Sequence, residues 1–359
     1  MASKNFQTIL FTFFLLISIF TTQVVSEGCE AEESENHCVN KKYALTLKLI
    51  AIAAILVTSM IGVCLPLITR SIPSLHPDKD IFVIVKAFAS GIILSTGFMH
   101  VLPDSFDMLS SSCLPEDPWH KFPFTGFVAM LSAILTLMVD SIFTSYGSWK
   151  RRSDSGSDQP NSVVVPNDTE MGATNNGNAF HGHAHSHSHG PKVEDAEQQL
   201  LRYRVIAMVL ELGIVVHSVV IGLSLGASMN TCTIKPLVAA LCFHQMFEGM
   251  GLGGSILQAK FKFMKNAIMV FFFSATTPFG IVIGVILSSV YSENDPKSLI
   301  IEGLLNASSA GLLIYMALVD LLAQDFMGTK MQGSIKLQIK GYVAVLLGAG
   351  GMALMAKWA

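Results

Sequence analysis

The chain has 359 residues, of which 51% are hydrophobic and only 14% are charged, and its mean hydropathy is +0.53. Such a composition argues against an ordinary soluble domain and indicates a protein that lies in a lipid bilayer. The net charge of -3 leaves no basic excess for holding a polyanion, so we expect no nucleic acid partner.

The N-terminus has the pattern of a secretory signal peptide. Lys4 precedes an apolar run over residues 9–20, and small and polar residues follow as far as Ser26. The run is shorter than the roughly 20 residues that a membrane-spanning helix needs, so we expect residues 1–26 to be removed. An uncleaved first span is the alternative. Residues 27–42 then form an extracellular N-terminal segment.

The six cysteines include no C-x-x-C pair, which argues against a zinc ribbon or a thioredoxin-like motif. Cys29, Cys38 and Cys113 fall in polar segments that the topology below places outside the cytosol, where disulfides persist. We expect a Cys29–Cys38 bridge, with Cys113 as the odd cysteine.

Eight long apolar segments recur along the rest of the chain. In lipid every backbone amide must be paired within its own segment, so each segment is predicted to be a helix. The expected fold is therefore all-α, a polytopic membrane bundle of eight transmembrane helices. The segments cover residues 43–69, 81–102, 122–146, 205–228, 234–257, 267–290, 299–322 and 342–358.

Lys and Arg gather in the connections on one side of these segments, for example at Arg151, Arg152, Lys260 and Lys262. By the positive-inside rule that side is cytosolic, and both mature termini are extracellular. The signal peptide favours the plasma membrane, with an endosomal or vacuolar membrane as the alternative.

The one long connection, residues 147–201, is rich in Ser, Asn, Asp and Gly and nearly free of aromatic residues. It is predicted to be a disordered cytosolic loop between transmembrane helices 1–3 (43–146) and 4–8 (202–359), because it cannot bury enough apolar surface to order itself. An imidazole-rich run in this loop predicts flexible metal binding with little discrimination among metals. Its histidines are His181, His183, His185, His187 and His189.

Two adjacent predicted helices concentrate polar residues, which inside a membrane mark a pathway by default. His217 lies in the fourth span, and His244 and Glu248 lie four residues apart on one face of the fifth. Two imidazoles and a carboxylate are suited to Zn²⁺ or Fe²⁺. The alternative is that the histidines are core residues that hydrogen-bond between helices. Two glycine pairs, Gly222/Gly226 and Gly249/Gly253, have the spacing that lets helices touch. Close contact between the helices would bring His217 toward His244 and Glu248.

An entrance is predicted at the outer end of the second span. His100 and Asp104 fall on one helical face there, Pro103 loosens the helix, and Asp107 follows. Imidazoles and carboxylates at an outer mouth concentrate cations. The alternative is a solvated helix end.

Three acidic residues are candidates for an exit path. Asp140, Glu211 and Asp320 each lie about two turns from the predicted cytosolic end of a span. The alternative for Glu211 and Asp320 is pairing with an interfacial Arg or Lys.

At this point the motifs resemble those of the ZIP (Zrt-, Irt-like protein) metal transporters. The resemblance rests on the segments HSVVIGLSLG from His217 and HQMFEG from His244, and on the His-rich loop between spans three and four. The segments GFMHVLPD from Gly97 and GLLIYMALVD from Gly311 are typical of the plant iron-regulated and zinc transporter branch.

The resemblance implies an eight-helix fold with extracytosolic termini and a transport site in which His217, His244 and Glu248 are the metal ligands. Other members carry a second metal, with Asn and Glu where this chain has Ser218 and Ile221, and Asp where it has Gln245. A second metal site is therefore left open, with Ser218 and Gln245 as its candidate residues.

The expected function is import of Zn²⁺ or Fe²⁺, with Mn²⁺, Co²⁺ and Cd²⁺ as further candidate cargoes, by alternating access around the three ligands. A divalent ion entering a negative-inside cell gains about 4.6 kcal/mol per 100 mV, so no ATP and no cofactor beyond the transported ion are expected. An intramembrane metallohydrolase is disfavoured because His-Glu-x-x-His is absent, so the chain is not expected to be an enzyme. A membrane metal sensor that signals through its His-rich loop is the alternative. Whether the chain forms a homo-oligomer stays open.

Overall fold

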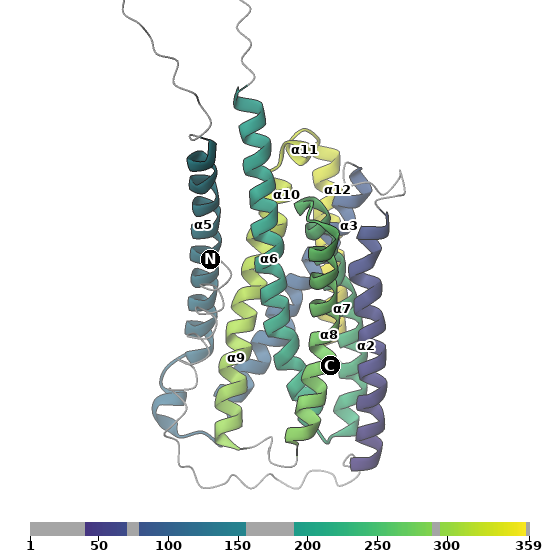
Figure 1. The fold of residues 1–359 in the computed structure, drawn as a ribbon. Coiled ribbons are helices and arrows are strands. Elements are labelled where there is room, and N and C mark those ends of the chain that lie inside the picture. Colours follow the sequence, from purple (N-terminus) through teal and green to yellow (C-terminus); the bar gives the residue numbers. More distant parts are fainter. Residues whose placement is uncertain (1–39, 70–78, 156–189, 289–294, 357–359) are drawn as a thin grey trace, which may run out of the picture.

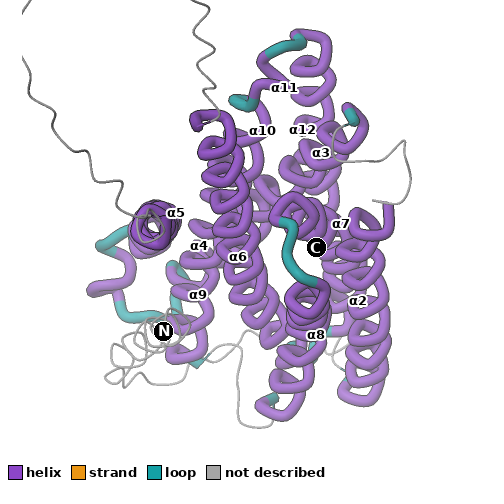
Figure 2. The backbone as a smooth tube through the Cα atoms, turned by 45° about the horizontal axis from the view of Figure 1, so that its top comes forward, coloured by secondary structure: helices purple, strands orange, loops and turns teal. Residues whose placement is uncertain are grey.

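A computed structural model describes residues 40–69, 79–155, 190–288 and 295–356. Helices are the only regular elements within these ranges, which confirms the all-α prediction (Figure 2). The predicted signal peptide, Cys29, Cys38 and the five loop histidines lie outside the described residues.

The helices follow the predicted spans in order. Seven of them are long and apolar enough to cross a membrane, and the remaining predicted span corresponds to α7, a 29-residue helix whose apolar run is interrupted by His244, Gln245, Glu248 and several glycines. The elements are α2 (Lys41–Thr69), α3 (Asp80–Thr96), η2 (Gly97–Val101), α4 (Leu102–Leu109), η3 (Glu116–His120), α5 (Phe124–Ser155), α6 (Gly190–Ala227), α7 (Thr231–Ala259), α8 (Phe263–Leu287), α9 (Pro296–Tyr315), η4 (Met316–Ala323), α10 (Gln324–Phe326), α11 (Thr329–Gln332) and α12 (Ile335–Ala356).

Two of the helices extend well into the predicted disordered loop. α5 continues from the expected end at residue 146 to Ser155, and α6 begins at Gly190 instead of near residue 205. The prediction of disorder over all of 147–201 is therefore wrong for these two ends. Helical hydrogen bonds lie within the backbone, so a helix does not end where its side chains become polar.

The bundle has two ends that differ in chemistry. α5 ends and α6 begins at the same end, at the top of Figure 1, which we call the loop end. At the opposite end Cys113 and Cys232 are both disulfide-bonded, whereas Cys64 and Cys242 are free thiols within the helices. The expectation that Cys113 is the odd cysteine is therefore wrong.

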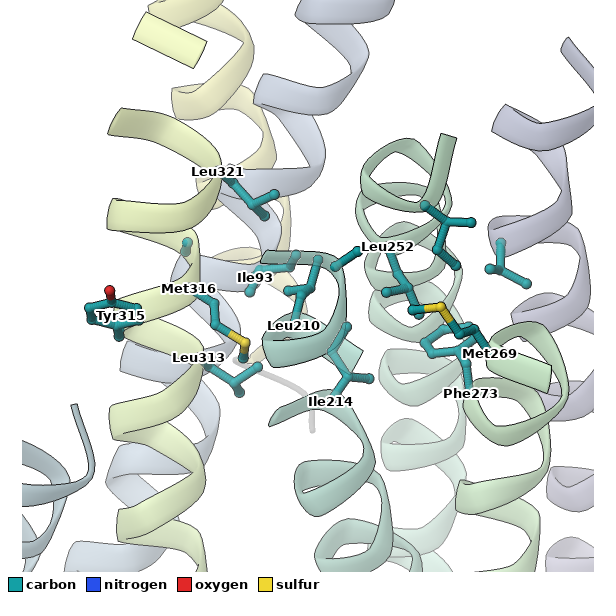
Figure 3. Close-up of a cluster of buried hydrophobic side chains, with 14 of the residues drawn as sticks. Ile93, Leu210, Ile214, Leu252, Met269, Phe273, Leu313, Tyr315, Met316 and Leu321 are labelled. Carbon is teal, nitrogen blue, oxygen red and sulfur yellow. The ribbon is translucent and has the colours of Figure 1, made fainter. Parts of the chain in front are cut away.

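The long helices form two sets. In the first set α7 packs along α2, and α6 packs along α8. α2 also contacts α8, and α6 also contacts α7. In the second set α3 packs along α12, and α9 packs along α4 and α5. The sets meet where α3 contacts α7 and where α6 contacts α5 and α9. A continuous apolar core crosses this boundary, with Ile93 of α3 and Leu252 of α7 among its members (Figure 3).

Glycines hold the first set together, but not in the predicted arrangement. A methyl group at Gly222 would lie 2.7 Å from the Thr277 carbonyl oxygen of α8, and one at Gly284 would lie 2.7 Å from the Cα of Gly226. A methyl group at Gly249 would lie 2.8 Å from the Val63 nitrogen of α2. Gly222 and Gly226 of α6 therefore contact α8, and Gly249 and Gly253 of α7 contact α2. The prediction that these two motifs draw α6 and α7 together is wrong.

Two stretches of wide helix interrupt the second set. The π-helical segment η2 contains His100, and η4 contains Asp320. Such segments are rare and frequently occur at functional sites, because the extra residue per turn re-aims the side chains. The sequence predicted that the helix loosens near Pro103, and the structure has the π-helical segment η2 just before this proline.

Candidate metal centre

α6 and α7 bring the three predicted metal ligands together. One ligand atom from each of His217, His244 and Glu248 lies within 4.8 Å of the others, and the imidazole centroids of the two histidines are 5.7 Å apart. All three side chains are at most 1% exposed. Zn²⁺ holds nitrogen and oxygen ligands at about 2.0–2.2 Å, so the cluster needs to close by less than about 1 Å to surround one ion.

The cluster has no hydrogen-bonding partners of its own. Both ring nitrogens of His217 and His244 and both carboxyl oxygens of Glu248 are buried, and none has a partner in the described structure. An unsatisfied buried polar group costs about 1–3 kcal/mol, so several together are retained only if something else binds them. The alternative reading, histidines satisfied by hydrogen bonds between helices, does not fit these contacts.

His100 lies nearer to this cluster than an entrance residue was expected to lie. Its ring centroid is 6.0 Å from that of His244, its side chain is 5% exposed, and its Nε2 is a buried atom without a partner. The π-helical turn of η2 presents it to α7. His100 therefore adjoins the metal centre and does not lie at the bundle surface.

The side chains next to the two cluster histidines are also buried and unpartnered. The Ser218 hydroxyl and both amide atoms of Gln245 have no hydrogen-bond partner in the described residues. Both side chains are fully buried. They supply three further oxygen or nitrogen atoms beside the cluster, which are chemically able to bind an ion or its water.

The other two predicted entrance residues continue from His100 toward the surface. Asp107 is exposed and Asp104 is half-buried, and the two carboxyl groups are close enough to interact electrostatically. Along α4 and η2, polar side chains therefore run from the exposed Asp107 through Asp104 to the buried His100.

The three predicted exit residues do not form one group. The Tyr315 hydroxyl donates to Asp140 Oδ2 at 3.4 Å, and the Asp320 carboxyl group is close enough to Asp140 to interact electrostatically. The charge beside Glu211 is instead Lys265. Asp140 is also about four turns from the end of α5, not two, because that helix continues to Ser155.

Sequence reasoning missed two participants in these polar groups. Tyr315 lies within the GLLIYMALVD segment but was given no role. Lys86 is a charged residue inside the second predicted span. Its charge could have indicated a buried ionic group, because charged residues within spans are rare and need a partner. Its Nζ donates to Asp325 Oδ1 at 3.0 Å and to Gln258 Oε1 at 2.9 Å.

Comparison with known proteins identifies the family of this chain. The family model described as ZIP Zinc transporter matches residues 45–356. A protein named probable zinc transporter 10 from Arabidopsis thaliana is 62% identical over 96% of this chain and 96% of its own length. Fe(2+) transport protein 1 from the same plant is 60% identical over 94% and 92%, and Fe(2+) transport protein 1 from Oryza sativa subsp. japonica is 58% identical over 91% and 87%. The chain belongs to the ZIP zinc transporter family.

Proposed function

We propose that this protein imports divalent transition-metal ions into the cytosol, with Zn²⁺ and Fe²⁺ as its principal cargoes. The observation that carries the proposal is the buried His217, His244 and Glu248 cluster, whose ligand atoms are close together and lack internal partners. Relatives named as zinc transporters and as Fe(2+) transport proteins support both ions. Mn²⁺, Co²⁺ and Cd²⁺ share ligand preferences with these two and are further candidates.

The path is proposed to run from Asp107 and Asp104 past His100 to the cluster. The increase in burial along these residues supports this order. Carboxylates at the mouth attract the hydrated cation, and imidazoles deeper inside replace part of its water. Asp140 and Asp320 then receive the ion on the far side.

The loop end is proposed to face the cytosol, with both mature termini extracellular. The excess of Lys and Arg in the connections at the loop end supports this orientation. The disulfide-bonded Cys113 and Cys232 at the other end support it independently, because disulfides persist outside the cytosol. The plasma membrane is the proposed location, and the histidines from His181 to His189 are proposed to bind metal on the cytosolic side.

Radiolabelled Zn²⁺ and Fe²⁺ uptake into metal-starved cells tests the function. Cells expressing His217→Ala or Glu248→Ala at the same surface level as the wild type should take up no more metal than untransfected cells. The exposed His120 and Glu116 provide matched controls, and His120→Ala and Glu116→Ala should leave uptake unchanged. Uptake that persists in both cluster variants would exclude the cluster as the transport site.

Deleting residues 181–189 separates transport from the alternative of a metal sensor. A transporter keeps its metal flux without these histidines, whereas a sensor loses its output. Wild-type protein that reaches the surface and takes up neither metal would favour the sensor.

A further inference from the structure

A buried ionic group lies between the metal centre and the loop end. Lys86 of α3 is 3% exposed and its Nζ is bonded to the Asp325 carboxylate of α10 and to the Gln258 amide oxygen of α7. Buried charge is costly unless it is paired and hydrogen-bonded, and Lys86 has both kinds of partner. We call this group the Lys86 latch.

The two bonds of the latch differ in what they connect. Asp325 lies on α10, which follows α9 and η4 directly and so belongs to the second set, as does Lys86 of α3. Their ion pair therefore lies within one set. Gln258 belongs to α7 in the first set, ten residues toward the loop end from Glu248. The bond from Lys86 to Gln258 therefore ties the helix that carries the metal ligands to the opposing set.

Apolar side chains fill the space between the cluster and the latch. A methyl group at Gly251 of α7 would lie 3.2 Å from Ile93 Cδ1 and 4.0 Å from Leu321 Cδ1. Leu252 and Ile256 are fully buried, and Ile93, Leu252 and Leu321 belong to the same core (Figure 3). An ion that leaves the cluster toward the loop end has to separate α7 from α3 at this level.

An apolar groove of about 460 Å³ runs along the boundary between the sets beside the latch. It is open to the surface, where Leu65 of α2 and Leu347 of α12 are exposed, and it is also lined by Lys86 and Phe88 of α3 and by Phe247 and Gly254 of α7. Because side chains do not fill this groove, the Lys86 to Gln258 bond is one of the contacts that hold α7 against α3 at this level.

We propose that the hydrogen bond between Lys86 and Gln258 is the latch that keeps the loop-end path closed, and that it breaks when the path opens to release the metal. This inference rests on the proposed function, since a path that never opens needs no latch. The Lys86–Asp325 ion pair remains intact in both states, so Lys86 does not become an unpaired charge.

The test uses two substitutions with opposite effects and a thiol that reports opening. Ser255, 2% exposed on α7 between Glu248 and Gln258, is changed to Cys in a protein whose free cysteines Cys64 and Cys242 are replaced by Ala. The rate at which a polar maleimide labels this thiol is measured with the full-length protein in lipid nanodiscs, where both faces are accessible.

Gln258→Leu removes the bond between the sets and should raise the labelling rate by at least about tenfold, the equilibrium change expected for the loss of one hydrogen bond to a charged group. Gln258→Glu replaces the hydrogen bond between the charged Lys86 and a neutral amide by an ion pair, and it should lower the labelling rate. Gln199→Leu, which removes a Gln hydrogen bond within α6, is the matched control and should change nothing.

Opposite shifts in the two variants support the latch, and equal rates or shifts in the same direction overturn it. Labelling needs no metal, so it is read separately from uptake. A wild type without uptake whose variants still shift in opposite directions would contradict the proposed function and its metal release, and it would support only the role of the Lys86 to Gln258 bond in holding the two sets together. Normal uptake with unchanged labelling would overturn the latch alone.

Discussion

The metal centre and the Lys86 latch are two buried polar groups that differ in how they are satisfied. In the latch, Lys86 Nζ donates to Gln258 Oε1 at 2.9 Å and to Asp325 Oδ1 at 3.0 Å. In the metal centre the ring nitrogens of His217 and His244 and the carboxyl oxygens of Glu248 have no partner among the described residues. The three cluster residues and Lys86 are almost completely buried, whereas Asp325 and Gln258 are partly buried. The latch is therefore satisfied by bonds within the protein, whereas the atoms of the proposed metal centre are left available to a bound ion.

The largest expected effect follows from removing one member of the complete group. Lys86→Met leaves Asp325 as a buried charge without its cation and should lower the free energy of unfolding by about 3–5 kcal/mol. Replacing both residues, in Lys86→Met with Asp325→Leu, should recover most of this loss. The measurement is unfolding of the purified protein in detergent.

The exposed Lys121–Asp117 pair, with a distance of 2.8 Å, is the matched control. Lys121→Met should cost less than about 1 kcal/mol, because exposed ion pairs contribute little. Equal losses in Lys86→Met and Lys121→Met would show that burial of the latch has no energetic consequence.

The incomplete group should instead gain stability from its ligand. Zn²⁺ at 100 times its Kd should stabilise the wild type by about 2.7 kcal/mol, and Glu248→Gln should lose this gain. Without metal the variant should unfold within about 1 kcal/mol of the wild type, since the carboxyl group has no internal partner to lose.

This comparison is made by thermal unfolding in a protein whose five loop histidines are replaced by Ser, so that only the buried centre is titrated. Glu116→Gln, at an exposed position, should keep the full metal effect. A Glu248→Gln protein that Zn²⁺ stabilises as strongly as the wild type would remove Glu248 from the centre.

An intermediate effect is expected at the glycine contact that holds α6 against α8. Gly226→Leu inserts a side chain against the backbone of α8 near Gly284 and should destabilise the protein by about 1–3 kcal/mol. Because His217 is on α6, the variant should also bind Zn²⁺ more weakly. Gly350→Leu is the control, since a methyl group there meets nothing within 4 Å. The same unfolding assay checks both variants, and equal stability would contradict the role of this contact.

The smallest effect is expected beside the ligands. Gln245→Leu removes a buried amide without partners next to His244 and should weaken Zn²⁺ binding about tenfold without loss of stability. Calorimetric titration measures the affinity, with Gln199→Leu as the control on the surface of α6. Unchanged affinity would show that the Gln245 amide does not act on the ion.

The helices and the three central ligands could be predicted because they depend on local rules. Apolar run length located the spans, and the four-residue spacing of His244 and Glu248 put them on one helical face. α7 could be assigned in spite of its polar residues because the mostly apolar segment over residues 234–257 is long enough to span. These inferences need only the chain's own sequence.

The rest depends on which helices meet. Nothing in the glycine spacing indicates that Gly222 contacts α8 and that Gly249 contacts α2. His100, whose ring centroid is 6.0 Å from that of His244, lies in the wide turn of η2, and its sequence spacing alone did not indicate that turn. The partners of Lys86 are 172 and 239 residues away along the chain, so sequence could flag the buried charge but could not pair it.

We propose that one ion binds directly to His217, His244 and Glu248. X-ray absorption spectroscopy of the protein with one equivalent of Zn²⁺ and the five loop histidines replaced by Ser tests this proposal. We expect nitrogen and oxygen ligands only, with scattering from two or more imidazoles that declines in His217→Ala and in His244→Ala. A sulfur ligand from Cys64 or Cys242, or a spectrum unchanged in both variants, would contradict it.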